Sequence, residues 1–287
     1  MANKLLIGAS LGVSGIEAII CDRNFNILEK KSAPFPGEIG KDSIISKLTK
    51  TITSLSEFHN AFAVGVSVPA TFSPDQNKII KSTIKDLDGV DIYRLVSKKI
   101  DKPVFFFRRS LAIMLAEQAF GAAKDFKDAM LIEIGRDISC SLLIGGKIYK
   151  GATNSAGLIG DTIVDITRAK RNDSGSFASL ISGEGVASLT GKSVYEMLSS
   201  SDGEGLVSKQ ILRDLKESLL TGFINAKLIF DPEAFIVCGD ILENYKLFEA
   251  SFKDLDVIIK KGEIGSSASA LGGAIALYNK TNLKNKG

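Results

Sequence analysis

The chain passes twice through one order of predicted elements: three strands, a helical segment and a fourth strand. In the first pass these elements fall at residues 4–8, 15–21, 27–32, 42–55 (with Asp42 as the expected N-cap) and 61–68. In the second pass they fall at residues 129–135, 138–144, 147–150, 176–230 and 234–238. Each pass opens with a hairpin that carries glycine. This repetition indicates an internal duplication, and therefore an α/β fold of two lobes with a cleft between them, which is a favoured place for a ligand.

The stretch from residue 103 to residue 165 carries the most informative charges. An apolar strand at residues 104–107 ends on Arg108 and Arg109, and a helix with Ser110 as its expected N-cap follows at once. A helix that begins where a strand ends presents free N–H groups to a ligand. The two arginines therefore mark a candidate ligand site, and an ordinary solvated strand end is the alternative.

Charge and composition argue against several classes of protein. The net charge is +3, with 45% hydrophobic and 24% charged residues, so nothing overall indicates nucleic acid or a membrane surface. No apolar run approaches the roughly 20 residues of a spanning helix. We recognise no signal peptide, so a cytoplasmic protein is expected. Cys21, Cys140 and Cys238 lie in apolar strands without metal-binding spacing, which predicts buried thiols, and the single histidine, His59, is expected at the surface.

A family pattern covers nearly the whole chain. Its segments are Leu6-Ile-Gly-Ala-Ser-Leu-Gly-Val-Ser-Gly-Ile-Glu-Ala18, Pro103-Val with Leu115-Ala-Glu117, Gly145-Gly-Lys-Ile-Tyr-Lys-Gly-Ala152, Gly157-Leu-Ile-Gly160, Ile224-Asn with Phe230-Asp-Pro-Glu-Ala-Phe-Ile-Val237, and Ala270-Leu-Gly-Gly-Ala-Ile-Ala276. In this order and spacing they resemble the ROK family, named for repressors, open reading frames and sugar kinases, within the actin/hexokinase-like ATPase superfamily.

The resemblance implies an α/β fold of two RNase-H-like lobes, at residues 1–110 and 111–287, with the last helix able to pack back on the first lobe. It implies that the cleft is lined by residues 10–14, 108–109, 135–137, 157–161 and 239–240. It also implies a homo-oligomer, for which residues 176–220 are the expected interface.

The first phosphate turn and the position of the catalytic base depart from the family. ROK kinases carry a sequence like Asp-Leu-Gly-Gly-Thr at this turn, whereas this chain has Ser10-Leu-Gly-Val-Ser14. The family's aspartate helps to hold the Mg–phosphate assembly, and a serine brings no charge to a dication. The family's Asn-Asp pair, whose aspartate takes the proton of the sugar hydroxyl, is replaced by Arg108 and Arg109. A guanidinium is no proton acceptor, and a general base contributes roughly 10² to 10⁴ in rate.

The second half of the chain departs from the family as well. The family's turn Gly-Thr-Gly is replaced by Gly135-Arg-Asp137. Without the second glycine a phosphate can no longer approach the backbone closely, and the carboxylate of Asp137 would repel it. The sugar-binding Gly-Glu-Ile-Gly-His becomes Gly157-Leu-Ile-Gly-Asp161, without the sugar acceptor and the metal-ligating histidine. The adenosine-side glycines are half kept in Cys238-Gly-Asp240. The positions that match the family's zinc cysteines are Ala169, Arg171 and Ser176, so no structural zinc is expected.

The candidate site therefore has no expected catalytic residue and no expected metal. The candidates for ligand binding are Arg108, Arg109, Gly157 and Asp161. The candidates for a nucleotide or phosphate loop are Gly12, Ser14, Gly135, Arg136, Gly239 and Asp240. We further predict that Arg109 and Asp161 form a salt bridge in the space of the sugar, with Arg108 or Arg136 free to favour a small anion such as a sugar phosphate. The alternative is that Arg109 swings into solvent.

Three functions remain open from the sequence. The first is a kinase-like protein that has lost activity and acts as a ligand sensor or partner subunit in carbohydrate metabolism, with no cofactor. The second is a glucokinase-like sugar kinase that uses ATP and Mg, with Asp137, Asp161 or Asp240 as a substitute base. The third is a transcriptional regulator that acts through a partner, because no basic recognition helix precedes the first strand and direct DNA binding is not expected.

Overall fold

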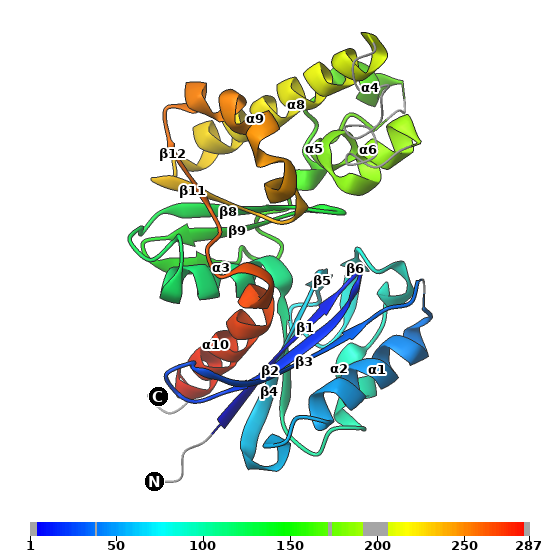
Figure 1. Ribbon diagram of the computed structural model, residues 1–287, viewed down its shortest axis with the longest axis vertical. Helices are drawn as coiled ribbons and strands as arrows, with labels where there is room; N and C mark the ends of the chain where they lie inside the picture. Colours follow the sequence, from blue (N-terminus) through cyan, green and yellow to red (C-terminus); the bar gives the residue numbers. More distant parts are fainter. Residues whose placement is uncertain (1–4, 38, 172–173, 192–205, 284–287) are drawn as a thin grey trace. The chain divides into compact units, whose positions relative to one another are not determined.

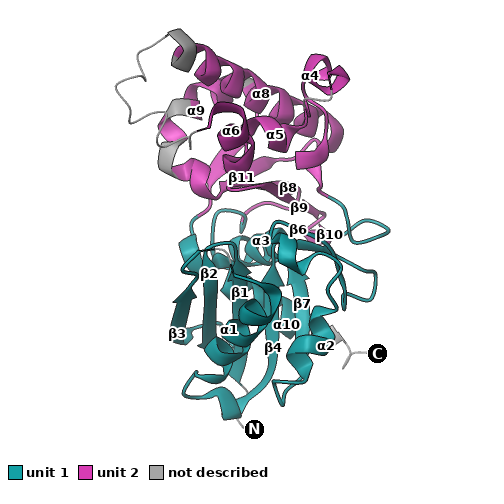
Figure 2. Ribbon diagram, turned by 90° about the vertical axis from the view of Figure 1, so that its right-hand side faces the viewer, with its two compact units in different colours: residues 1–124, 150–156, 263–287 teal, residues 125–149, 157–262 magenta. Residues whose placement is uncertain are grey.

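The computed structural model describes residues 5–37, 39–171, 174–191 and 206–283. The chain forms two compact units (Figure 2). Unit 1 comprises residues 1–124, 150–156 and 263–287, and unit 2 comprises residues 125–149 and 157–262. The chain therefore leaves unit 1 twice and returns to it twice. Residues 111–124 and 150–156, which were assigned to the second lobe from the sequence, lie in unit 1. Residues 263–287 lie there as well, and their helix was expected to be able to pack back on the first lobe.

Unit 1 is built on a five-stranded sheet. In sheet order its strands are β3 (Ile27–Pro34), β2 (Gly15–Cys21), β1 (Leu5–Gly12), β4 (Ala61–Val68) and β7 (Val104–Arg108). The first three pair antiparallel as consecutive hairpins, whereas β1, β4 and β7 run parallel. The remaining elements are α1 (Lys41–Thr53), the ribbon of β5 (Ala70–Phe72) and β6 (Ile79–Ser82), α2 (Ile92–Ser97), α3 (Arg109–Phe120) and α10 (Ala268–Leu283). The carboxyl ends of β1, β4 and β7 meet at one edge, which is where α/β proteins place ligand chemistry.

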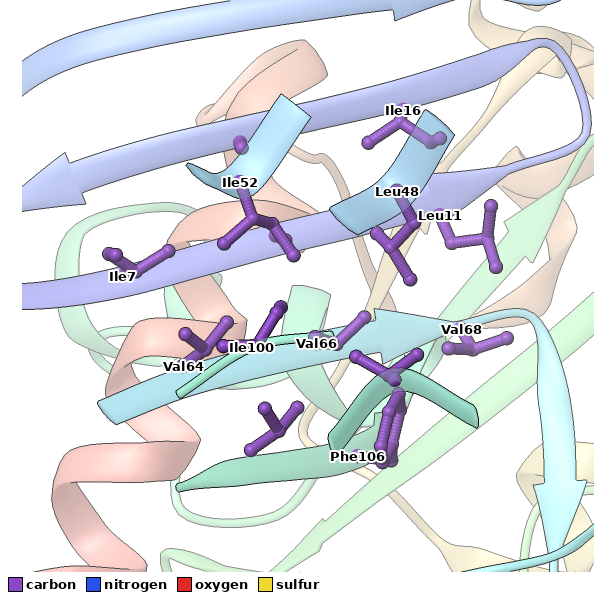
Figure 3. Close-up of a cluster of buried hydrophobic side chains, with 14 of the residues drawn as sticks. Ile7, Leu11, Ile16, Leu48, Ile52, Val64, Val66, Val68, Ile100 and Phe106 are labelled. Atoms are coloured by element: carbon purple, nitrogen blue, oxygen red, sulfur yellow. The ribbon is translucent and has the colours of Figure 1, made fainter. Parts of the chain in front are cut away.

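The two faces of this sheet are covered by different helices (Figure 1). Successive side chains of a strand point to opposite faces. Ile7 and Leu11 of β1 pack with Leu48 and Ile52 of α1 in the main core, as Figure 3 shows. Gly8 faces the other way and lies against α10. Because β1 is buried on both faces, it reads in the sequence as a nearly continuous apolar run.

Unit 2 repeats the strand order of unit 1. In sheet order its strands are β10 (Lys147–Tyr149), β9 (Ile138–Ile144), β8 (Ala129–Ile134), β11 (Ala234–Cys238) and β12 (Ile258–Lys261). The hairpins of β8, β9 and β10 are antiparallel, and β11 and β12 run parallel to β8. Its helices are α4 (Ile166–Lys170), α5 (Phe177–Ile181), α6 (Gly183–Thr190), α8 (Leu206–Phe230) and α9 (Tyr245–Phe252). The predicted repeat of strands is thus confirmed. None of the described helices combines the length and apolarity needed to cross a membrane.

Two predicted helix caps were wrong. The helix α3 begins at Arg109, and its N-cap is the extended residue Arg108 rather than Ser110, which is buried. The helix α1 begins at Lys41 after Gly40, so Asp42 lies in the first turn and is not the cap. The mostly helical region expected at residues 176–230, with breaks at its glycines, contains the helices α5, α6 and α8, and residues 192–205 of it lie outside the described residues.

The helix α10 packs on β1 and β4 at backbone distance. A Cβ added at Gly8 would overlap the carbonyl oxygen of Ala270, and one added at Gly65 of β4 would overlap that of Gly273. On the far side of α10, a Cβ at Gly272 would overlap the carbonyl oxygen of Ala112 in α3. Three glycines therefore set the separation between this helix and its neighbours, because any side chain would push α10 outward.

We predict that Gly65→Ala destabilises the protein by about 1–3 kcal/mol or more, since overpacking a close contact of backbone on backbone forces a shift of α10. The matched control is Gly40→Ala, because a Cβ there meets nothing within 4 Å. The control should lose less than about 1 kcal/mol, the scale of an N-cap change. Urea unfolding of both variants measures the difference, and equal losses would contradict the close packing of α10.

Candidate functional site

Ser10 and Ser67 lie side by side near the carboxyl ends of β1 and β4, where they are register partners. Both side chains are buried, with 5% and 0% exposure, on the face that α10 covers. Ser269 in the first turn of α10 is 1% exposed and lies against both. Buried hydroxyls require hydrogen-bond partners, and these three serines supply them to one another.

The hydroxyls form a chain of hydrogen bonds that begins at the donor Arg109 and ends at the carbonyl of Ala9. Ser67 Oγ donates to the carbonyl of Ala9 at 3.2 Å. Because a hydroxyl has one proton to donate, Ser67 then accepts from Ser269 Oγ, which lies 2.6 Å away. Ser269 in turn accepts from Ser10 Oγ at 3.0 Å, and Ser10 accepts from Arg109 Nη1 at 3.0 Å. Hydrogen bonds that run in one direction polarise and strengthen one another. The chain thus holds one end of the Arg109 guanidinium against β1.

The guanidinium of Arg109 lies at the first turn of unit 1. Its Nη1 would be 3.9 Å from a Cβ at Gly12, the last residue of β1. Ser14 of the same turn is exposed, and its carbonyl accepts from the backbone N–H of Phe35 at 2.8 Å. The structure therefore brings the candidates Gly12 and Arg109 together, with Ser10 as the contact between them. A guanidinium here supplies positive charge and N–H donors and accepts no proton.

Arg108 is engaged with the chain itself. Its Nη1 donates to the carbonyl of Asn154 at 3.1 Å and to that of Ala156 at 2.6 Å. Asn154 is further held by Pro74, whose carbonyl accepts from its side chain at 3.3 Å. Arg108 therefore fixes residues 150–156 within unit 1. Arg108 is therefore not the free guanidinium that the sequence predicted at this position.

The turn Gly135-Arg-Asp137 of unit 2 is closed by the start of α6. The backbone N–H of Gly183 donates to the carbonyl of Gly135 at 2.8 Å, and that of Glu184 donates to the carbonyl of Arg136 at 3.1 Å. Arg136 Nε also lies 3.6 Å from Glu184 Oε2, so this arginine is not free either. The first N–H groups of α6, which a phosphate would need, are directed to the turn instead.

Negative charge gathers at the same turn. Asp137 accepts from the N–H of Ile138 at 2.8 Å, and Asp240 Oδ2 would be 3.4 Å from a Cβ at Gly135. With Glu184, three carboxylates and the guanidinium of Arg136 lie at or beside the turn. Sequence reasoning missed Glu184, although the N-cap serine before it, Ser182, marked a helix start. This local charge opposes the binding of a phosphate chain.

Two of the candidate glycines of unit 2, Gly157 and Gly239, are explained by packing and backbone conformation. Gly157 has φ +89° and Gly239 has φ +89°, a region that favours glycine. A Cβ at Gly157 would lie 2.7 Å from the carbonyl oxygen of Cys140, and one at Gly239 would lie 2.5 Å from that of Ile134. Asp161 ends a short 3-10 helix and is exposed. Because Asp161 belongs to unit 2 and Arg109 to unit 1, their salt bridge stays a prediction.

The segment that would hold zinc in the family is closed by backbone hydrogen bonds. The N–H groups of residues 164 and 165 donate to the carbonyl of Gly175 at 2.9 and 3.0 Å, and Phe177 N–H donates to the carbonyl of Thr162 at 2.8 Å. Asp165 caps α4 by accepting from two backbone N–H groups. Within the described part of the chain, no group of three or more His, Cys, Asp or Glu residues has the arrangement of a metal site.

The predicted burial of the three thiols is confirmed, since Cys21, Cys140 and Cys238 all lie buried. Burial raises the pKa of the Cys21 thiol to about 12, with a smaller contribution from Asp22. A thiol with so high a pKa is neutral at physiological pH and is no nucleophile. The cysteines therefore belong to the core rather than to the candidate site.

We predict that a metal chelator leaves the Tm of the protein unchanged, because backbone hydrogen bonds join residues 162, 164 and 165 to residues 175 and 177. Thermal unfolding with and without excess EDTA measures this. A ROK protein that holds structural zinc is the positive control and should lose stability. A fall in Tm of several degrees in this chain would contradict the prediction.

Comparison with known proteins assigns the family. The ROK family model matches residues 6–278. An uncharacterized protein of Clostridium perfringens is 25% identical over 244 residues, which cover 83% of this chain and 82% of that protein. The xylose repressor of Bacillus subtilis is 26% identical over 172 residues, which cover 57% of this chain but only 44% of the repressor. This chain belongs to the ROK family.

Solved structures agree on the fold. The ROK hexokinase of Thermus thermophilus has a TM-score of 0.80 at 18% identity, covering 97% of this chain and 99% of that one. The ROK glucokinase of Streptomyces griseus, in complex with glucose and AMPPNP, has a TM-score of 0.77 at 20% identity, covering 95% and 98%. The predicted actin/hexokinase-like α/β fold is confirmed. The cleft and the roles of the site residues stay predictions.

Proposed function

We propose that this ROK-family protein has lost sugar-kinase activity and acts as a ligand sensor or a non-catalytic partner subunit in carbohydrate metabolism. The observation that supports this most directly is the hydrogen bond of 3.0 Å from Arg109 Nη1 to Ser10 Oγ. These two residues stand at the positions where the family resemblance places the catalytic base and the aspartate that holds Mg. Both carboxylates are replaced, and the replacements bind each other.

The proposed loss has two physical causes in unit 1. A guanidinium cannot take the proton of a sugar hydroxyl, and the absence of a general base costs roughly 10² to 10⁴ in rate. A dication beside Ser10 would also face the charge of Arg109 rather than an oxygen anion, and like charges a few ångströms apart repel. One arginine thus opposes both requirements of phosphoryl transfer.

Unit 2 supports the same proposal. Where the family pattern has a glycine-rich phosphate turn, the first N–H groups of α6 are bonded to the carbonyls of Gly135 and Arg136. Asp137, Glu184 and Asp240 add negative charge at that place. A nucleoside triphosphate at this turn would find the backbone N–H groups already hydrogen-bonded, and the carboxylates would repel its phosphates. We therefore propose a protein that needs neither ATP nor Mg as a cofactor.

For the ligand, we propose a sugar derivative that carries an anion, such as a sugar phosphate. The structure of the Streptomyces griseus glucokinase contains glucose, and a fixed guanidinium such as Arg109 attracts phosphate more than a neutral hydroxyl. We further propose that Arg109 pairs with Asp161 when no anionic ligand is bound, that the protein is a homo-oligomer and that its location is cytoplasmic. Regulation through a protein partner is a second candidate, favoured by the likeness to the xylose repressor.

We predict no detectable phosphorylation of glucose, mannose or N-acetylglucosamine with ATP and Mg in a coupled assay. A ROK glucokinase assayed in parallel is the positive control. If ordinary turnover appears and is abolished by Asp137→Asn, Asp161→Asn or Asp240→Asn, the alternative of a sugar kinase with a substitute base is correct and our proposal is wrong.

We predict that glucose 6-phosphate binds more tightly than glucose, and that Arg109→Gln weakens its binding about 10- to 100-fold, the scale of a hydrogen bond to a charged group. Isothermal titration calorimetry measures both affinities. The control is Arg94→Gln, since Arg94 is exposed on α2 of the same unit. Tighter binding of glucose, or an equal loss in both variants, would refute the proposed anion preference.

A further inference from the structure

Glu117 is a buried carboxylate in the last turn of α3, with 1% of its surface exposed. Its Oε2 accepts from the backbone N–H of Ala122 at 2.8 Å and from that of Glu263 at 3.1 Å. Its Oε1 accepts from the backbone N–H of Ile264 at 3.0 Å. A carboxylate that accepts backbone N–H groups forms strong, charge-assisted bonds. One side chain therefore ties together segments that lie about 140 residues apart in the sequence.

The donors stand at two places where the chain passes between the units. The chain leaves unit 1 after Lys124, two residues beyond Ala122, and returns to unit 1 for the last time at Glu263. Glu117 thus binds the outgoing and the final incoming segment at once. Its backbone carbonyl also accepts from the N–H groups of Gly121 and Ala123, at 3.0 and 3.1 Å.

Helix capping does not explain this residue. The carboxyl end of a helix carries partial negative charge, so an acidic side chain in the last turn is unfavourable there. A Cβ at Gly121 would overlap Glu117 Oε2, so the chain leaves room for this carboxylate. Its two bonds to residues 263 and 264 lie outside α3 and its own turn. The placement of the charge therefore serves the returning segment.

At the other end of α3, a second charged side chain binds the backbone just before the chain passes into unit 2. Arg108, the N-cap of α3, donates to the carbonyls of Asn154 and Ala156, and the chain enters unit 2 after Ala156. Residues 150 and 156 are joined by a bond of 3.0 Å from Ala156 N–H to the Lys150 carbonyl. Each end of α3 thus carries a charged side chain that forms hydrogen bonds with backbone groups near a crossing, by which we mean a place where the chain passes from one unit to the other.

We propose that Glu117 is a carboxylate anchor that restrains the chain at the crossings after Lys124 and before Glu263. Its three bonds limit how far the backbone at these crossings opens, while the two sheets keep their own stability. The anchor is a conformational element of unit 1, and it does not depend on whether the protein phosphorylates a sugar or binds a sugar phosphate.

The test is Glu117→Gln, read by amide hydrogen exchange and by limited trypsin digestion. Glutamine keeps one acceptor oxygen and places an NH2 group against a backbone N–H, so at least one bond is lost. We expect the amides of residues 122, 263 and 264 to exchange at least about tenfold faster. Cleavage after Lys124 and Lys261, both exposed beside the crossings, should accelerate likewise.

The matched control is Glu29→Gln in unit 1. Glu29 Oε2 accepts from the N–H and the hydroxyl of Ser56, at 2.7 and 2.6 Å, away from any crossing. This variant should accelerate exchange at Ser56 and leave the crossings unchanged. For Glu117→Gln, unchanged exchange at residues 122, 263 and 264 overturns the proposal. Faster exchange throughout β1 and β8 also overturns it, because Glu117 would then serve global stability.

A second pair of variants decides the question if Glu117→Gln fails to fold. Ile264→Pro removes the donor to Glu117 Oε1, and Ile264 has φ −73°, which proline tolerates. Ile264→Ala loses the side chain but keeps the N–H. We expect faster cleavage after Lys261 in the proline variant than in the alanine variant. Equal cleavage rates in the two would overturn the anchor.

Discussion

The close packing of α10 on β1 and β4 is the contact on which the rest of unit 1 depends. Because Gly8 and Gly65 carry no side chain, the helix backbone reaches the backbone of the sheet. This separation brings Ser269 within hydrogen-bond distance of Ser10 and Ser67. A longer side chain at either glycine would move α10 outward and break the hydroxyl chain that positions Arg109. Packing in the framework therefore sets the geometry of the candidate site.

The two units keep one topology and have taken opposite charges at equivalent turns. Each sheet has the order of two antiparallel hairpins followed by two parallel strands. The first turn of unit 1 lies beside the guanidinium of Arg109, whereas the first turn of unit 2 lies among Asp137, Glu184 and Asp240. A duplicated framework tolerates such changes because its stability comes from buried apolar strands, and the turns contribute little to it.

The helix α3 connects the candidate site with the segments where the chain passes between the two units. Its first residue is Arg109, and its last turn holds Glu117, which binds both segments beside two of the crossings. Twelve residues of helix span about 18 Å. The same helix therefore carries Arg109 of the candidate site and the residue that we propose to restrain the crossings.

Much of the fold was predictable from the sequence by itself. Apolar runs, glycine turns and their repetition determined the succession of strands along the chain in each unit, and the apolar setting of Cys21, Cys140 and Cys238 determined that these thiols are buried. The identities of Ser10 and Arg109 led to the prediction that two carboxylates of the family pattern are replaced in this chain. These features are local, because side-chain periodicity and turn chemistry operate over a few residues.

Only the tertiary structure decided which groups meet. Ser10 bonds Ser269 across 259 positions of the chain and Arg109 across 99. No local pattern marks such partners, because they depend on strand register and on the approach of α10. The same holds for Glu184, which pairs with Arg136. It also holds for Arg108, which was predicted to be free but donates to two backbone carbonyls. A side chain's identity states what it can bind, and packing determines what lies within its reach.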